Sequence, residues 1–379
     1  MENYPIKLLS CDTHLEHPAT VMSGYVGDKF QDILKKALSM VSLWNNSMPY
    51  QGPTGVPLGT LAGVNQFHEV RQGKYDLETM QIPGTYGGAK DYIGWLDIDR
   101  IDSAVILPGA ALTTALAMVG MTCDREDRIE FIQGYNNFIS DFCAEYPGRL
   151  LGGACVPHTS IDDAIAELHR IKDLPGICTV SPGNFPNGSA SPEIIDDRFY
   201  AELMELGMPI TLHGGVSSAP GSIKSPKDVA TWIIGHTEVA TGGPFSAAQL
   251  IMSGVFDRLP EMRFIILEAG ASWLPFMMST MDHMWDRHRH WAGIELKNPP
   301  SWYCTSGNIL WNIISDRPAI EFRDRIGVGN LSWAADFPHS NSEWPHSQVS
   351  ALQLCAGIPA KERYDILWGN AARFYGLDY

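Results

Sequence analysis

Four apolar runs in the sequence are each followed at once by side chains that could bind a metal ion or move a proton. Asp12 and His14 follow the first run, His213 and Glu268 follow two later runs, and Asp336 follows the last. Residues two apart on an extended strand point the same way, so Asp12 and His14 can address one ion. Imidazole and carboxylate ligands together suit Zn²⁺, Mn²⁺ or Fe²⁺ and leave a position for water or substrate. The sequence therefore predicts one divalent metal ion, held by Asp12, His14, His213 and Asp336.

Glu268 is the first candidate for a group that transfers a proton. It follows four apolar residues, 264–267, where burial would raise the pKa of its carboxyl group toward a useful range. We interpret Glu268 as a general acid or base, or as an additional metal ligand. The structural alternative is a carboxylate that fixes Trp273 or a loop amide.

Further polar side chains follow the same runs. Glu16 could line a substrate pocket, and the spacing Asp-x-His-x-Glu would also suit a second metal ion. His339 is predicted to orient a ligand rather than to bind metal, and with Trp273 it completes the predicted substrate contacts. Three other histidines fall on a predicted outer helix and fit a solvated face rather than a metal site: His283, His288 and His290.

The elements that must position these groups repeat a short β-branched run and an amphipathic helix, which is typical of a parallel sheet wrapped by helices. Eight such runs predict an α/β fold, a (β/α)₈ barrel of the TIM type, with reactive groups at the C-terminal ends of the strands. A doubly wound sheet is the alternative, but no Gly-rich phosphate loop follows the first strand. The predicted strands are Ile6–Cys11, Ser103–Leu107, Leu151–Val156, Gly176–Ser181, Met208–Leu212, Arg263–Leu267, Trp302–Thr305 and Ile326–Ala335.

The helices between these strands are predicted from apolar periodicity and from their ends. One begins near Asp124 and stops before Pro147, and another has Ser160 as its N-cap. Two more are predicted over Arg198–Leu206 and Pro359–Trp368. We predict that residues 1–379 form one domain.

Residues 44–94 interrupt the alternation of strands and helices. They are rich in Gly, Pro, Tyr and Gln and show little periodicity. We interpret them as an insertion after the first strand that walls the substrate pocket. A packing embellishment or a dimer contact is the alternative reading.

Composition limits the class of protein. The chain has 379 residues and a net charge of −16, which disfavours binding to nucleic acid. No apolar stretch approaches the roughly 20 residues that span a bilayer, so no membrane partner is expected. The seven cysteines are scattered and no signal peptide precedes the first strand, so we expect a cytoplasmic protein with a small-molecule substrate.

A series of motifs occurs in the order found in one known group of enzymes. The chain contains Asp12-Thr-His14, Leu212-His213-Gly-Gly, Gly254-Val-Phe-Asp-Arg-Leu-Pro260, Ile266-Leu-Glu268-Ala-Gly-Ala-Ser-Trp273-Leu-Pro275, Trp333-Ala-Ala-Asp336-Phe-Pro-His339 and Gly369-Asn-Ala-Ala-Arg-Phe-Tyr-Gly376. With these motifs the chain resembles the amidohydrolase superfamily, in the branch typified by aminocarboxymuconate-semialdehyde decarboxylase and the hydroxybenzoate decarboxylases. The resemblance covers almost the whole chain outside residues 44–94.

The resemblance implies roles for individual residues and a homodimer. The family's metal ligands fall on Asp12, His14, His213 and Asp336, and the last of these can also handle a proton. His236 lies at or near a histidine that relatives often have, so it is a candidate for substrate contact or a further ligand, with a surface or capping residue as the alternative.

Two departures from the family pattern leave the reaction type open. Glu268 stands where the characterised decarboxylases have a catalytic histidine, and Asp12 stands where the first ligand is often His or Glu. The expected function is therefore a metal-dependent hydrolase or non-oxidative decarboxylase that acts on a small cyclic or aromatic carboxylate. A non-haem di-iron oxygenase and a non-catalytic binding barrel are the alternatives.

Overall fold

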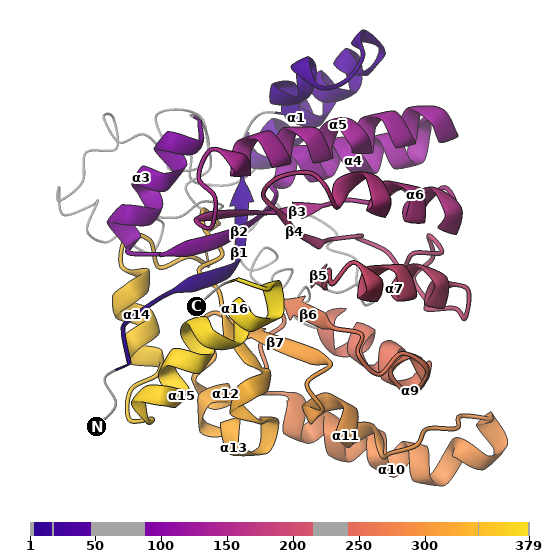
Figure 1. Cartoon of the computed structure of the whole chain (residues 1–379), viewed down its shortest axis with the longest axis vertical. Coiled ribbons are helices and arrows are strands. Elements are labelled where there is room, and N and C mark those ends of the chain that lie inside the picture. The colour runs from indigo at the N-terminus through magenta and orange to yellow at the C-terminus, as the bar shows by residue number, and fades with distance from the viewer. Residues whose placement is uncertain (1–3, 17–18, 47–87, 215–241, 340, 378–379) are drawn as a thin grey trace.

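Eight parallel strands form the centre of the molecule (Figure 1). The computed structural model describes residues 4–16, 19–46, 88–214, 242–339 and 341–377. Each strand pairs with the next along the chain, in the order β1 to β8. The strands are β1 (Leu9–Leu15), β2 (Ser103–Pro108), β3 (Leu150–Ala154), β4 (Ile177–Val180), β5 (Ile210–His213), β6 (Phe264–Leu267), β7 (Ile309–Ile313) and β8 (Leu331–Trp333).

The first and last strands meet just beyond β8, which confirms the predicted barrel. The amide of His14 donates to the carbonyl of Phe337 at 2.7 Å, and the amide of Asp336 donates to the carbonyl of Asp12 at 3.0 Å. A parallel bridge joins Thr13 and Phe337 between these two bonds. The closure places the residues after β8 directly beside the polar end of β1.

Two of the predicted strands were wrong in position. Residues 302–305 belong to helix α11 (Pro300–Thr305), and the seventh strand is Ile309–Ile313. A short apolar run does not distinguish strand from helix, whereas Pro299 and Pro300 suit the start of a helix. The eighth strand is shorter than the predicted 326–335, because Ile326 ends helix α13 (Arg323–Ile326).

Helices follow most of the strands and surround the barrel (Figure 1). The remaining helices are α1 (Gln31–Asn46), α3 (Ala89–Asp99), α4 (Ala110–Thr122), α5 (Arg125–Ala144), α6 (Ile161–Ile171), α7 (Asp196–Glu205), α9 (Val255–Arg258), α10 (Leu274–Ala292), α12 (Arg317–Glu321), α14 (Ser347–Leu354), α15 (Ala360–Tyr364) and α16 (Asn370–Tyr375). Short turns of 3₁₀ helix lie at Ala19–Gly24, Asp28–Phe30 and Val328–Asn330, and a π-helical turn at Asp365–Gly369 joins α15 to α16. Among the described residues, no helix is long and apolar enough to span a membrane.

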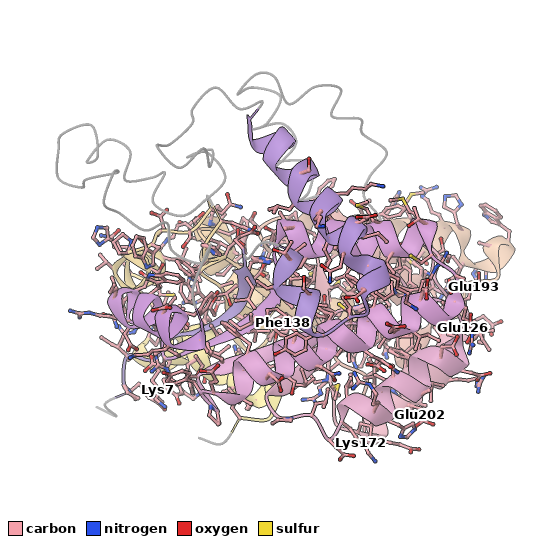
Figure 2. The ribbon with its side chains drawn as sticks, turned by 90° about the horizontal axis from the view of Figure 1, so that it is seen from above. Lys7, Glu126, Phe138, Lys172, Glu193 and Glu202 are labelled. Atoms are coloured by element: carbon pink, nitrogen blue, oxygen red, sulfur yellow. The ribbon has the colours of Figure 1, made fainter. Side chains whose placement is uncertain are left out.

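Helix α5 illustrates how the apolar periodicity positions a helix on the barrel. It begins next to Asp124, as predicted, and Asp124 caps it by accepting a hydrogen bond from the Asp127 amide. Its buried face includes Phe131 and Phe138, whereas Glu126 is exposed at the edge of the molecule (Figure 2). The predicted N-cap at Ser160 is likewise confirmed for α6.

The predicted insertion after β1 is partly regular. Its first residues lie in α1 and its last in α3, so both ends are helical rather than irregular. The buried residues Ala89, Tyr92, Ile93 and Leu96 recur at helical spacing in α3, but the predicted insertion ended inside this helix and divided the signal. Residues 47–87, the rest of the predicted insertion, lie outside the described residues.

The C-terminal helix packs its side chains against the interior residues of the barrel. Side chains of α16 and of the turn before it pack in one cluster with inward-facing strand residues: Trp368, Phe374 and Tyr375 with Leu9, Val105, Leu151, Ile265 and Leu310. The strand residues named here lie in the first half of their strands, and the same cluster extends to Leu107 and Leu267 near the C-terminal ends of β2 and β6. The polar groups follow beyond these ends.

Candidate metal centre

Strand β1 carries Asp12 and His14 into the barrel. The pairing register between β1 and β2 shifts between Ser10 and Thr13, so the strand bulges where Asp12 lies. The Ser10 hydroxyl donates to the carbonyl of Asp12 at 2.8 Å and accepts from the Ala335 amide at 2.8 Å. Asp12 is fully buried and His14 is almost so. The bulge therefore has its backbone groups bonded while both side chains face the barrel interior.

Four side chains from three strands gather around the ring of His14, in overlapping groups of metal-binding type that include Asp12-His14-His213 and His14-Asp336-His339. Nε2 of His14 lies 3.1 Å from Oδ1 of Asp12 and 3.3 Å from Oδ1 of Asp336. Nε2 of His213, at the end of β5, lies 3.3 Å from Nε2 of His14 and 3.6 Å from Oδ1 of Asp12. Ligands that share one ion at bonds of about 2.1 Å lie about 3.4 Å apart around a tetrahedral centre and about 3.0 Å apart around an octahedral one. The observed separations fall close to this range.

Unpartnered carboxylate oxygens give a second test of whether a cation fits. Among the described residues, Oδ2 of Asp12 and Oδ2 of Asp336 have no hydrogen-bond partner, and Oδ1 of Asp12 faces Nε2 of His14 at 3.1 Å. Buried carboxylates without partners are unfavourable unless they are neutralised or bind a metal ion. The donor set and its missing partners therefore fit a divalent cation.

The charges in this cluster depend on each other. Burial and the charge of His339 lower the pKa of His14, but Asp12 and Asp336 outweigh them and raise it from 6.5 to about 9. Burial works against ionisation of Asp336 as well, yet His339 and His14 hold its pKa well below its ordinary range. A metal ion that binds here must displace a proton from His14.

Glu268 lies directly after β6 and faces the same cluster. Its Oε2 is 3.7 Å from Nε2 of His213, and 15% of its side chain is exposed. Burial raises the pKa of Glu268, and Asp336 and Asp12 add to this, whereas His213 opposes it. Its backbone is left-handed, with φ of 55°, a conformation that costs about 1–3 kcal/mol for a residue other than glycine.

The structure does not support the alternative in which Glu268 fixes Trp273. The indole N–H of Trp273 donates instead to the carbonyl of Ala269 at 2.8 Å. The ring of Trp273 packs edge-on against Trp311, with centroids 5.4 Å apart. These contacts tie Trp273 to the loop after β6; its predicted contact with substrate stays a prediction.

His339 and Glu16 lie behind Asp336. Nδ1 of His339 is 3.0 Å from Oδ1 of Asp336, and Nε2 is 2.9 Å from Oε1 of Glu16. The same Glu16 oxygen accepts the amide of Ala110 at 2.8 Å, at the start of α4, and the His339 ring stacks on His14 with centroids 4.0 Å apart. Both ring nitrogens of His339 are thus within hydrogen-bonding distance of carboxylates, which agrees with an orienting role.

Other predicted residues lie away from the cluster or outside the described part. His236 falls in residues 215–241, which are not described. The helix α10 carries His283, His288 and His290 on its outer side, and none of them belongs to a group of metal-binding type among the described residues. Nδ1 of His288 accepts the indole N–H of Trp291 at 3.0 Å.

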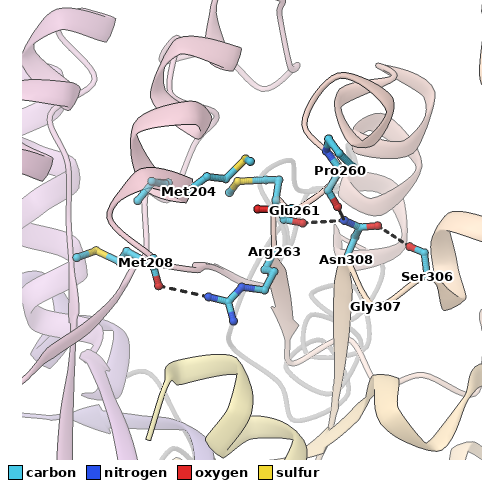
Figure 3. Close-up of a pocket in the computed structure, with 11 residues that line it drawn as sticks. Met204, Met208, Pro260, Glu261, Arg263, Ser306, Gly307 and Asn308 are labelled. Atoms are coloured by element: carbon cyan, nitrogen blue, oxygen red, sulfur yellow. Dashed lines mark hydrogen bonds between the residues drawn. The ribbon is translucent and has the colours of Figure 1, made fainter.

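A pocket of about 450 Å³ opens at the other end of the barrel (Figure 3). It is lined by residues that precede β5, β6 and β7, far along each strand from the polar ends. Its main polar groups already have partners, since Arg263 donates to the carbonyl of Phe374 and Asn308 donates to the carbonyls of Pro260 and Met262. Among the described residues, none that line this pocket belongs to a group of metal-binding type.

One residue near the cluster was overlooked in the sequence. Asp316 follows β7, and its carboxylate accepts hydrogen bonds from the loop that carries Glu268. It was missed because the seventh strand was predicted too early in the chain. The run Asp316-Arg-Pro318, a helix cap followed by proline, is the signal that could have found the end of this strand.

Comparison with known proteins agrees with this geometry. Residues 93–377 match the family model described as Amidohydrolase (Amidohydro_2). The 2-amino-3-carboxymuconate-6-semialdehyde decarboxylase of Dictyostelium discoideum is 22% identical over 344 residues, which are 81% of this chain and 93% of that protein. The gamma-resorcylate decarboxylase of Rhizobium sp. (strain MTP-10005) is 26% identical over 273 residues, 67% of this chain and 79% of that protein.

A solved structure shares the fold. The 5-carboxyvanillate decarboxylase of Novosphingobium aromaticivorans superimposes with a TM-score of 0.66 at 18% identity and covers 98% of this chain and 96% of its own. That structure contains manganese and 4-hydroxy-3-methoxy-5-nitrobenzoic acid.

Proposed function

Because this chain belongs to the amidohydrolase family that its residues 93–377 match, we propose that it is a metal-dependent, non-oxidative decarboxylase of a small aromatic carboxylate. The observation that carries the proposal is the convergence of two imidazoles and two carboxylates at the C-terminal ends of β1, β5 and β8. Two curated relatives from different organisms bear the names of decarboxylases, which favours this reaction over hydrolysis. The substrate is a small molecule.

We assign one divalent ion to Asp12, His14, His213 and Asp336. Manganese is the first candidate because the solved relative contains it, and the mixed ligand set also suits zinc or iron. A bound divalent ion supplies a Lewis acid that draws electron density from an oxygen of the substrate. A second ion bound through His339 would have to displace Glu16 or Asp336 from its ring nitrogens, and we therefore propose one ion rather than a di-iron pair.

Glu268 is the proton donor in this proposal. In a non-oxidative decarboxylation the bond between the ring carbon and the carboxylate breaks, CO₂ leaves, and the ring carbon takes up a proton. Glu268 lies at the end of β6, within 3.7 Å of His213, in surroundings that favour its neutral, proton-bearing form. The lowered pKa of Asp336 makes it a poor donor and also a poor acceptor of protons, so we assign it the role of ligand and not the predicted proton-handling role. His236 remains a candidate substrate contact.

The test measures CO₂ release by the manganese-loaded protein. Gamma-resorcylate and 5-carboxyvanillate, the compounds in the relatives' names, are the first substrates to try, together with other hydroxybenzoates. We expect CO₂ release from at least one of them, lost on metal removal and restored by manganese. Hydrolysis of an ester or amide without CO₂ release, or two iron ions per chain, would contradict the proposal.

The variant Glu268→Gln tests the proton donor. It nearly keeps the size and hydrogen-bonding capacity of the side chain, so we expect full metal content and a rate reduced by about 10²–10⁴-fold. Glu126→Gln, an exposed change on α5, is the matched control and should leave the rate unchanged. If Glu268→Gln instead lowers metal occupancy, Glu268 is a ligand; a normal rate at full occupancy removes it from the mechanism.

A further inference from the structure

One carboxylate, on the segment that follows the neighbouring strand β7, binds the backbone of the loop between β6 and α10. Oδ2 of Asp316, three residues beyond the end of β7, accepts the amide of Ala271 at 2.7 Å and the amide of Ser272 at 2.8 Å. Strands β6 and β7 are hydrogen-bonded neighbours, so the two loops leave the barrel side by side (Figure 1). Asp316 therefore fixes the backbone three and four residues after Glu268.

The backbone of this loop is unusual where Asp316 approaches it. Glu268 and Gly270 are both left-handed, with φ of 55° and 62°. A Cβ atom at Gly270 would lie 2.9 Å from Oδ2 of Asp316, so glycine is needed for the carboxylate to reach the two amides. On the other side, Trp273 donates to Ala269 and packs against Trp311 of β7. The loop is thus tied to β7 through Trp311 and to the segment after β7 through Asp316.

We propose that Asp316 is a positioning residue, which holds the left-handed backbone of Glu268 and so directs its carboxyl group toward His213 and the metal site. A left-handed residue persists only where its surroundings impose it, and the two bonds to Asp316 are the charged contacts that do so here. The effect on rate rests on the proposed function of Glu268. The effect on the loop does not depend on any reaction.

Asp316 also caps helix α12, and the test must separate this role from its bonds to the loop. Its Oδ1 accepts the amide of Ala319 at 3.3 Å and caps α12. Serine is also a good N-cap, but its single, shorter hydroxyl cannot both cap α12 and reach the loop. Asp316→Ser therefore keeps the cap and removes the bonds to Ala271 and Ser272.

A matched control exists elsewhere in the chain. Asp124 caps α5 by accepting the Asp127 amide at 3.0 Å, on the outside of the barrel. Asp124→Ser makes the same chemical change at a helix start without touching the loop after β6. Gly270→Ala is an independent second variant. It leaves Asp316 unchanged and adds a Cβ atom on the loop, which would push the Asp316 carboxylate away from the two amides.

The first readout is amide hydrogen exchange in peptides that span 268–276, measured on the full-length, manganese-loaded protein. We expect exchange at Ala271 and Ser272 to accelerate by about tenfold or more in Asp316→Ser and in Gly270→Ala, and to stay unchanged in Asp124→Ser. Unchanged exchange in both loop variants would overturn the proposal.

The second readout compares kcat, KM and manganese affinity with the substrate found above. We expect kcat of Asp316→Ser to fall by about 10- to 100-fold, because small misplacements of a reacting group have effects of that size, while KM and the manganese Kd stay close to wild type. Faster exchange with a normal kcat would overturn the positioning role, provided that Glu268→Gln does lower kcat. If Glu268→Gln is also normal, the proposed function of Glu268 fails, and the exchange data alone decide whether Asp316 holds the loop.

Discussion

Asp99 is a buried carboxylate whose charge should destabilise the folded protein at neutral pH. It ends α3 and is only 1% exposed, and its Oδ1 accepts the amide of Ser347 at 2.7 Å, at the start of α14. Burial raises the pKa of Asp99 from 3.8 to about 6; the bonds from Ser347 and the charge of His346 oppose this, and Glu343 adds to it. Asp99→Asn keeps an acceptor oxygen for the Ser347 amide and removes the charge.

The effect of the Asp99 charge on the free energy of unfolding follows from its pKa of 3.8 in the unfolded chain and about 6 in the folded protein. Below pH 3.8 the carboxyl group is protonated in both states, so its charge has no effect on stability. As the pH rises from 3.8 to about 6, the unfolded chain loses this proton first and the free energy of unfolding falls. The penalty is about 0.5 kcal/mol at pH 4 and reaches about 3 kcal/mol above pH 6, at about 1.4 kcal/mol per tenfold difference in proton affinity.

Urea unfolding of metal-free protein at several pH values between 4 and 7.5 measures this difference. The difference in the free energy of unfolding between Asp99→Asn and wild type should grow by about 2–3 kcal/mol, in favour of the variant, as the pH rises from 4 to 7.5. Asp286→Asn, at a side chain that is 76% exposed, is the control and should show no such trend. A constant difference between Asp99→Asn and wild type at every pH would refute the argument, because the gain would then not come from the charge.

Two further predictions concern the metal and the assembly. The double variant His14→Ala/His213→Ala removes both imidazoles and should abolish stoichiometric metal binding, measured by metal analysis of the purified protein; full metal content would place the site elsewhere. The chain should be a homodimer in solution, as its resemblance to the family implies, and a monomeric mass in analytical ultracentrifugation would contradict this.

The candidate metal ligands could be found from the sequence because they depend on a local pattern. In a barrel of this type the C-terminal ends of all strands lie on one side, so a polar residue directly after an apolar run is enough to place it there. Asp12, His14, His213 and Asp336 were all found in this way, and each of them belongs to one or more of the overlapping groups of metal-binding type in the structure. No contact between distant residues had to be predicted.

Contacts between loops could not be predicted in the same way. Glu16 and His339 are 323 positions apart, and Asp316 and Ala271 are 45 apart. No periodicity links such pairs, since each pairing follows from how the barrel closes and how neighbouring loops leave it. An error in one strand also affects the residues after it: because the seventh strand was predicted over 302–305, Asp316, three residues beyond the true strand, was not considered.

The backbone at two site carboxylates shows why local preference alone would not predict their geometry. Glu268 and Asp336 are left-handed, and in the described part of the chain only Arg100 among other non-glycine residues shares this conformation. Glycine would relieve the strain at either position but would supply no carboxylate. The barrel-closing bond from the Asp336 amide to Asp12 holds one of them, and Asp316 holds the loop of the other. In both cases a long-range contact offsets the cost of a left-handed backbone, about 1–3 kcal/mol. Such a cost is expected at a position where the side chain is needed for its chemistry and not for its backbone preference.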